Sequence, residues 1–361
     1  MEDAIAPAAP PASLPPPVPP RAEAAATTEH PFEFHGDARE YFRIWIVNLA
    51  LTILTLGIFS AWAKVRSERY FYGNTRLAGV PFEYLAQPLP ILKGRIIALV
   101  LFSAYVLAGQ VSVGLQLGAA GVIALLTPWL LVRGAAFRAR YSSWRGLSFR
   151  FVPDYAEAYI RYLLLWLPLV VTVGLLYPYM KAKQKQFFVE HHRYGGAWFR
   201  FRATSQDFYP PYVIAFVAMI GVMVLAGLAM AASVMLAGEF PQWLAMAFPL
   251  LVYGGYFAVW AVLAAVLANL VYNRTDLGPY RFRSSLGGGR LFWLYATNTL
   301  AILASAGLMI PWARVRLARY RAQCLSVLAA GDFADFRRES RDDVDATASE
   351  MDGLFDIDIG L

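Results

Sequence analysis

Long runs of uncharged, mostly apolar residues dominate the middle of the chain. They lie at 44–63, 96–132, 162–180, 208–238, 240–273 and 291–313. A helix that crosses the hydrocarbon of a bilayer needs about 20 such residues. The run at 96–132 is too long for one crossing and divides near 117–121. The pattern therefore predicts about seven hydrophobic helical segments.

A transmembrane barrel would instead show segments of about 10 residues in which apolar and polar positions alternate. The runs of this chain are longer and do not alternate. Helices are the other structure that satisfies every backbone hydrogen bond within lipid. The sequence thus predicts an all-α polytopic membrane protein.

Internal repeats organise the membrane domain. Two segments that begin at Phe32 and Phe149 align without a gap, and each has a glycine 25 residues later. A third begins at Tyr280 and needs two extra residues before the corresponding Gly307. Two further copies lie within the long apolar stretches, so five copies of one motif are expected along the chain.

Each copy carries an aromatic residue at the expected membrane edge, and a basic residue follows it by four positions in four copies. The copy with Trp260 has Ala264 at that position instead. Positions 0, +4 and +7 share one helix face, and Trp and Tyr favour the interface. The pattern predicts an aromatic–basic rim. Its candidate residues are Trp62, Arg66, Arg69, Trp129, Arg133, Tyr179, Lys183, Trp312, Arg316 and Arg319.

This rim is expected to bind anionic lipid headgroups, because arginine holds phosphate through two hydrogen bonds. Interfacial anchoring of the helices alone would explain the same stripe. Both interpretations remain open from the sequence.

Short β-hairpin arms are expected about twelve residues after four of the aromatics. Each of these stretches has a polar opener, a glycine and an aromatic–x–aromatic pattern, as in NTRLAGVPFEY from Asn74. Alternation with a turn signal predicts a hairpin, and an isolated hairpin is marginal in water. The arms are expected at the membrane edge, packed on one another or on the helices. They lie near 72–84, 141–151, 187–201 and 272–282.

Composition changes at both ends of the membrane domain, 32–330. Residues 1–31 are rich in Ala and Pro and contain no apolar core of a secretory signal, so a disordered tail is predicted. Residues 331–361 form an acidic tail that is also expected to be disordered. Between the tails, 32–331 carries a net charge of +17. Its basic residues lie in short loops beside the apolar runs, which favours anionic membrane lipids over nucleic acid as partners.

The charge distribution also bears on topology. Seven plain crossings would place basic loops on both sides of the membrane, against the excess of Lys and Arg normally found on the cytoplasmic side. If the runs at 44–63, 162–180 and 291–313 each fold back near their glycine, every basic loop lies on the cytoplasmic side. Both arrangements remain open at this stage, as does the oligomeric state.

Candidate chemistry is sparse. The apolar runs contain no Asp or Glu, and the chain has no phosphate-binding loop, nucleophile elbow or zinc-ligand spacing. Asp37, Asp154 and Glu157 precede expected helices, where carboxylates favour the helix start. We predict no catalytic residue, no cofactor and no metal site, which favours a non-enzymatic protein over an intramembrane enzyme.

A channel or transporter for a small solute is the alternative function. Its path would be lined by uncharged polar residues inside the membrane, with Asn48, Asn269 and Asn298 as the main candidates. Interhelical hydrogen bonding is the simpler role for these asparagines.

The repeated GIFSAWAKVR and GLMIPWARVR, together with arms such as NTRLAGVPFEY, resemble the YjgN-like family of bacterial inner-membrane proteins, a domain of unknown function. The resemblance covers 32–330. It implies a location in the bacterial inner membrane, which agrees with the multi-pass arrangement expected from the apolar runs, and it brings no activity or catalytic residue with it.

Overall fold

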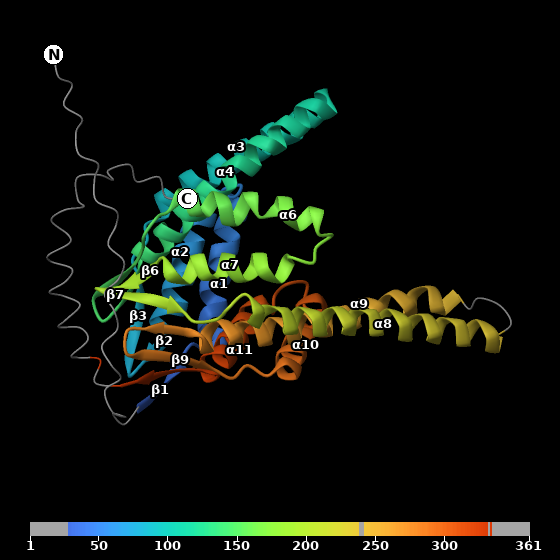
Figure 1. Cartoon of the computed structure of the whole chain (residues 1–361). Coiled ribbons are helices and arrows are strands. Elements are labelled where there is room, and N and C mark those ends of the chain that lie inside the picture. Colours follow the sequence, from blue (N-terminus) through green and yellow to red (C-terminus); the bar gives the residue numbers. More distant parts are fainter. Residues whose placement is uncertain (1–27, 238–241, 331–332, 334–361) are drawn as a thin grey trace, which may run out of the picture.

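The computed structural model describes residues 28–237, 242–330 and 333. Within this part, ten short strands close into a barrel, and pairs of helices extend from it (Figure 1). The strands are β1 (Thr28–Phe34), β2 (Thr75–Leu77), β3 (Val80–Tyr84), β4 (Ser142–Trp144), β5 (Leu147–Phe151), β6 (His192–Tyr194), β7 (Ala197–Phe201), β8 (Thr275–Leu277), β9 (Tyr280–Ser284) and β10 (Leu325–Ala329).

Each helix pair lies between two consecutive strands: β1 and β2, β3 and β4, β5 and β6, β7 and β8, and β9 and β10. The helical elements are α1 (Ala38–Leu54), α2 (Ser60–Asn74), α3 (Pro88–Val111), α4 (Val113–Arg140), α5 (Tyr155–Tyr159), the π-helical η1 (Ile160–Leu164), α6 (Trp166–Val171), α7 (Tyr177–Glu190), the 3₁₀ turn η2 (Gln206–Phe208), α8 (Tyr209–Ala237), α9 (Gln242–Asn273), α10 (Gly288–Ala304) and α11 (Ile310–Gln323). Because neighbouring strands run antiparallel, each strand–helix pair–strand connection leaves and re-enters the barrel at the same end.

Tight turns join the strands at the opposite end. In the β2–β3 turn, Ala78 and Gly79 have φ angles of +48° and +75°. Two consecutive residues with positive φ form the turn whose twist matches that of paired strands. Leu77 therefore pairs directly with Val80.

The barrel closes through strands from the two ends of the described chain. β1 pairs with β2 through Phe32 and Leu77, and with β10 through Thr28 and Ala329. The interior is filled by buried side chains rather than open. They are Leu77, Trp144, Tyr194, Leu277, Tyr280, Val327, Ala329 and Phe333.

Two helix pairs are long. α3 and α4 have 24 and 28 residues, and α8 and α9 have 29 and 32. At about 1.5 Å per residue, each exceeds the roughly 30 Å hydrocarbon core of a bilayer. Four helices of the described chain are long and apolar enough to span a membrane, and only 11% of the most apolar window of each is buried. Their apolar surface is therefore left for lipid, and the chain is an integral membrane protein.

Three helix pairs are short: α1 with α2, η1 and α6 with α7, and α10 with α11. In the first, Leu56 and Gly57 have φ angles of +51° and +93°, and the Gly57 N–H donates to the Thr52 carbonyl at 2.7 Å. The same reversal occurs at Val173–Gly174 and Ala306–Gly307. Leu56 is 94% exposed and Val173 is 92% exposed. These tips present apolar side chains outward while the chain folds back.

The predicted all-α fold with about seven hydrophobic segments is therefore wrong. Hydropathy counts the run at 44–63 as one crossing, whereas the reversal at Leu56–Gly57 divides it between two antiparallel helices. The expected arms are consecutive strand pairs of one closed barrel rather than separate hairpins.

Two further predictions concern the tails. β1 begins at Thr28, inside the expected tail 1–31, because its Thr28–Pro31 segment pairs with β10. Residues 1–27 and nearly all of 331–361 lie outside the described residues, so the rest of these two predictions stays untested.

Candidate functional site

The aromatic–basic stripe lies at a constant distance from the barrel. Its aromatic residue is 11 to 13 residues before the end of α2, α4, α7, α9 and α11. In a helix this corresponds to about 18 Å. Beyond that level the helix pairs differ. α2 begins only two residues before Trp62, whereas α4 begins 16 residues before Trp129.

Within the stripe, the basic side chain folds over the aromatic ring one turn away. Arg133 lies 5.5 Å from the ring centroid of Trp129, Lys183 lies 5.7 Å from that of Tyr179, and Arg316 lies 5.0 Å from that of Trp312. These are cation–π distances. The spacing of four residues thus produces the same local contact on three helices.

The first copy departs from this pattern. Arg66 lies 5.4 Å over the ring of Phe59, and Phe59 stacks on Trp62 at 6.0 Å. The Arg66 side chain is exposed. Its charge therefore faces outward beside an aromatic pair rather than on Trp62 itself.

The arginines at the +7 position bind the protein itself. Arg69 donates to the carbonyls of Tyr84 and Ala86 at 3.3 and 3.1 Å. Arg319 donates to the carbonyl of Gly36 at 3.0 Å. Ala86 and Gly36 each lie two residues beyond the end of a strand, β3 and β1. These two arginines tie a helix to the exit of a neighbouring strand.

The three candidate asparagines have different surroundings. Asn269 is fully engaged: its Oδ1 accepts from the Leu286 N–H at 2.9 Å and its Nδ2 donates to the Leu286 carbonyl at 2.9 Å. Asn298 accepts from Arg316 Nη1 at 3.1 Å. Asn48 is 3% exposed, yet neither Nδ2 nor Oδ1 has a hydrogen-bond partner among the described residues.

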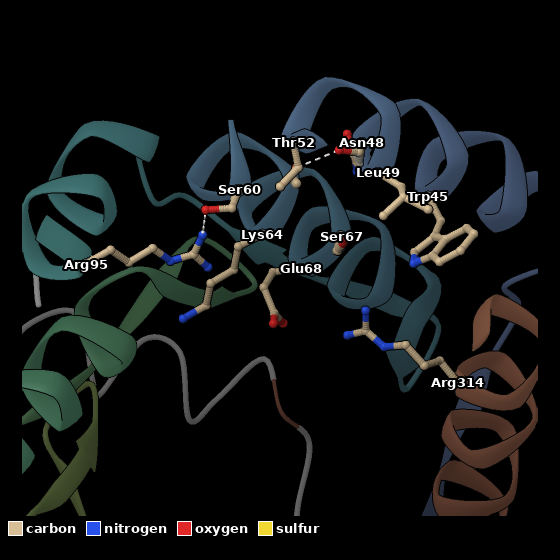
Figure 2. A pocket seen from close by; sticks show the side chains of 11 residues that line it. Trp45, Asn48, Leu49, Thr52, Ser60, Lys64, Ser67, Glu68, Arg95 and Arg314 are labelled. Carbon is tan, nitrogen blue, oxygen red and sulfur yellow. Dashed lines mark hydrogen bonds between the residues drawn. The ribbon is translucent and has the colours of Figure 1, made fainter. Parts of the chain in front are cut away.

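Asn48 lines a cavity of about 290 Å³ between α1, α2, α3 and α11 (Figure 2). The lining residues are Trp45, Asn48, Leu49, Thr52, Ser60, Ala63, Lys64, Ser67, Glu68, Arg95 and Arg314. We call this cavity the Asn48 pocket. Three of its side chains are cationic and one is acidic. Within the described part of the chain, the ion pairs involve none of these four residues.

Two of the cations are held in place by neighbours. Arg95 donates to Ser60 Oγ across the pocket edge. Arg314 Nη1 donates to the Tyr41 hydroxyl at 2.5 Å, and its guanidinium carbon lies 5.0 Å from the Phe71 ring centroid. Each guanidinium keeps further N–H donors, since arginine has five. The pocket thus offers several positioned donors and an excess of positive charge.

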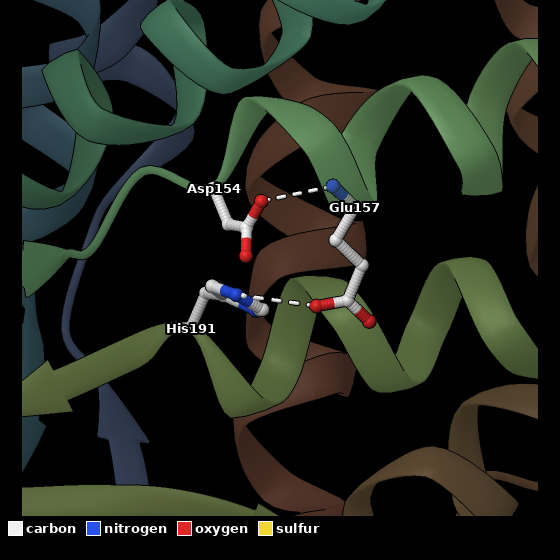
Figure 3. A group of neighbouring side chains, drawn as sticks. All are labelled: Asp154, Glu157 and His191. Atoms are coloured by element: carbon white, nitrogen blue, oxygen red, sulfur yellow. Dashed lines mark hydrogen bonds and ion pairs between the residues drawn. The ribbon is translucent and has the colours of Figure 1, made fainter. Parts of the chain in front are cut away.

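A second group brings together possible metal ligands. Asp154, Glu157 and His191 offer ligand atoms within 4.8 Å of one another (Figure 3). Sequence spacing missed it because His191 directly follows α7 and is distant from α5 along the chain, although it lies close in space. Each member already has a role: Asp154 caps α5 through the Glu157 N–H at 2.8 Å, and Glu157 pairs with Arg161 at 2.7 Å.

His191 completes this group. Its Nδ1 lies 2.9 Å from the Phe187 carbonyl and its Nε2 lies 3.5 Å from Glu157. Burial raises the pKa of the adjacent Glu190 carboxyl. The Arg161 guanidinium already supplies the positive charge that a metal ion would bring to Glu157. We therefore treat the group as the brace between α5 and the end of α7.

The prediction that carboxylates mark helix starts is confirmed at Asp37. Its Oδ1 accepts from the N–H groups of Arg39 and Glu40 at 2.8 and 3.2 Å, at the start of α1. These two hydrogen bonds lower the pKa of the Asp37 carboxyl. Asp37 thus acts as a helix cap rather than as part of a site.

The sequence analysis named Asn48 but missed the charges around it. Lys64 and Arg314 both lie two positions after the rim aromatic, in the first and last copies. This shared position could have identified both residues as candidates from the sequence. Arg95 lies in α3, far from any motif, and only the packing of α3 against α2 brings it to the pocket.

Comparisons with known proteins agree on one family. The model of a family described as "Bacterial protein of unknown function (DUF898)" matches residues 29–354. The protein named "Inner membrane protein YjgN" of Salmonella typhimurium is 31% identical over 152 residues, 40% of this chain and 37% of that protein. Its namesake in Escherichia coli K12 is 30% identical over 152 residues, 40% of this chain and 36% of that protein. The match thus spans less than two fifths of each relative's length. No solved structure matches the chain.

Proposed function

The chain belongs to the DUF898 family, and we propose that it is an inner-membrane protein whose rim binds anionic lipid headgroups on the cytoplasmic side. The observation that carries the proposal is a set of three rim cations, Arg66, Arg133 and Lys183. Each lies on an aromatic ring, and none has an acidic partner in the part of the chain that the structure describes. In addition, Arg133 Nε is buried without a hydrogen-bond partner there.

The position of the rim supports a headgroup role. If the aromatic level marks the near edge of the hydrocarbon, the 16 residues of α4 before Trp129 extend about 24 Å into the bilayer. The rim cations then lie one turn toward the barrel, at the depth of lipid phosphates. The strands are too short to cross, since the longest has seven residues of about 3.3 Å each. We therefore propose that the barrel lies outside the membrane.

Fewer rim residues are available for lipid than the sequence suggested. Arg69 and Arg319 bind backbone carbonyls, and Arg316 donates to Thr297 Oγ1 at 2.6 Å and to Asn298. We propose that Arg69, Arg316 and Arg319 hold the helices in place. The remaining rim cations, Arg66, Arg133 and Lys183, then bind lipid.

Native mass spectrometry of the purified protein tests the proposal. In mixed phosphatidylglycerol and phosphatidylethanolamine micelles, we expect wild type to retain phosphatidylglycerol preferentially. The triple variant Arg66→Gln, Arg133→Gln, Lys183→Gln is expected to bind severalfold less of it. The matched control removes three exposed barrel charges, Arg76, Arg200 and Arg281, and is expected to bind as wild type does. Equal loss in both variants, or in neither, contradicts the proposal.

A channel or transporter is the second candidate, favoured by the Asn48 pocket, in which Asn48, Thr52, Ser60 and Ser67 offer uncharged polar groups. The packed interior of the barrel disfavours a path through it. Solute flux in proteoliposomes tests this directly, and flux that depends on Asn48 would support it over lipid binding.

A further inference from the structure

We infer that the Asn48 pocket is a specific site for a phosphate ester that carries free hydroxyl groups, supplied by the phosphoglycerol headgroup of an anionic phospholipid. This inference rests on the proposed function and deepens it. The rim would attract anionic lipid in general, whereas the pocket would hold one headgroup.

Charge selects an anion. Lys64, Arg95 and Arg314 reach the pocket from three different helices, against the single acid Glu68 (Figure 2). Phosphate oxygens bind such donors through short, charge-assisted hydrogen bonds. A zwitterionic headgroup would leave this positive excess only partly matched, so a headgroup of net negative charge fits better.

The unpartnered amide selects a hydroxyl. A buried amide normally finds partners, because leaving its donors and acceptor unsatisfied is costly. The corresponding Asn298, nine residues before its tip glycine as Asn48 is before Gly57, binds Arg316 instead. The equivalent arginine of the first pair, Arg66, lies on Phe59 and leaves Asn48 open. A hydroxyl both donates and accepts, so it satisfies the amide beside the phosphate.

Size and position agree with a headgroup. The cavity of about 290 Å³ takes a phosphoglycerol group. Trp45 and Leu49 line it with apolar surface, which suits the glycerol ester end of a lipid. Lys64 lies two residues beyond Trp62, so the pocket sits at the level of the rim.

The test measures lipid dissociation constants by native mass spectrometry on the full chain in detergent. We expect wild type to bind one phosphatidylglycerol at least tenfold more tightly than further copies or phosphatidylethanolamine. Asn48→Leu, and separately Lys64→Gln with Arg95→Gln, are expected to raise that dissociation constant at least tenfold. The matched control, Arg66→Gln with Arg133→Gln, is expected to keep the tight site while losing weaker lipids. Thermal unfolding of each variant verifies that it is folded.

The outcomes separate the two levels of the proposal. If both pocket variants keep the tight site, the pocket assignment is overturned while rim binding stands. If wild type shows no preference for phosphatidylglycerol, both proposals are overturned. Soluble glycerol phosphate provides the second arm. If it binds as tightly as the lipid and Asn48→Leu weakens both, the pocket assignment stands and the lipid source is overturned.

Discussion

The short and long helix pairs share one connection to the barrel but differ in what they do beyond the aromatic level. α2 extends only two residues past Trp62 toward its tip, whereas α4 extends 16 residues past Trp129. The short pairs reverse through a glycine with positive φ, and the long pairs continue. We propose that only the long pairs cross the membrane, because only their helices are long and apolar enough to span it. The short pairs are then free to build polar contacts at its surface.

The largest expected difference concerns a charge placed beyond the aromatic level. Val122→Arg puts a guanidinium at mid-depth in α4, where arginine costs about 3 kcal/mol of insertion free energy. Leu56→Arg, at a short tip, is expected to cost under about 1 kcal/mol because the side chain reaches the headgroups. The membrane-inserted yield of the two variants gives the comparison. Equal losses would mean that the short tips lie as deep as the long helices.

The second-largest expected difference is in unfolding free energy, between variants of two equivalent asparagines, Asn48 and Asn298, in two short helix pairs. Asn298→Leu removes an acceptor from the partly buried Arg316, and we expect about 2 kcal/mol of lost unfolding free energy. Asn48→Leu removes an amide that already lacks partners and should leave stability unchanged or raise it. Thermal unfolding in lipid-free detergent distinguishes them. A large loss for Asn48→Leu would show a partner for this amide within the protein.

Two arginines on one face of α2 provide a matched pair of equal charge. Arg69→Gln loses two hydrogen bonds to backbone carbonyls, and about 1 kcal/mol of stability is expected to go with them. Arg66→Gln loses an exposed cation–π contact worth only about 0.5 kcal/mol. Arg66→Gln should weaken lipid binding more than Arg69→Gln does. Chemical denaturation combined with lipid titration measures both effects.

An effect similar in size to that of Arg69→Gln tests the reversal itself. Gly57 has a φ of +93°, so Gly57→Ala is strained even though the space around it is open. A loss of about 1 kcal/mol is expected. Gly121 lies within helix α4, also in open space, and Gly121→Ala should be neutral or slightly stabilising. Matching losses at both sites would argue against a strained tip.

Features that depend on local spacing could be predicted from the sequence. The four-residue interval of Trp129 and Arg133 produces their contact within a single helix, and the glycine turn of NTRLAGVPFEY produces the β2–β3 hairpin. Neither depends on distant residues. The family resemblance read from these motifs is confirmed by the match to residues 29–354.

Closure of the barrel could not be predicted from the sequence, because it depends on strand pairing across almost the whole described chain. Thr28 pairs with Ala329, and nothing near either residue signals the other. The Asn48 pocket has the same difficulty. Asn48 could be named as a polar residue among apolar ones, but its lack of a partner is a property of packed helices. The position of Arg95 at the pocket also depends on the packing of α3 and cannot be predicted from local sequence.

Thiol accessibility tests the central claim, that only the long pairs cross and that the barrel stays on the cytoplasmic side. The single cysteine of the chain, Cys324, is first replaced by alanine. One cysteine at a time is then placed at Ser112 between α3 and α4, at Leu56 on a short tip, or at Ala78 in a barrel turn. An impermeant maleimide added to intact spheroplasts is expected to label Ser112→Cys alone. Ala78→Cys should react only after lysis. Labelling of Leu56→Cys or Ala78→Cys from outside, or protection of Ser112→Cys, would contradict the account.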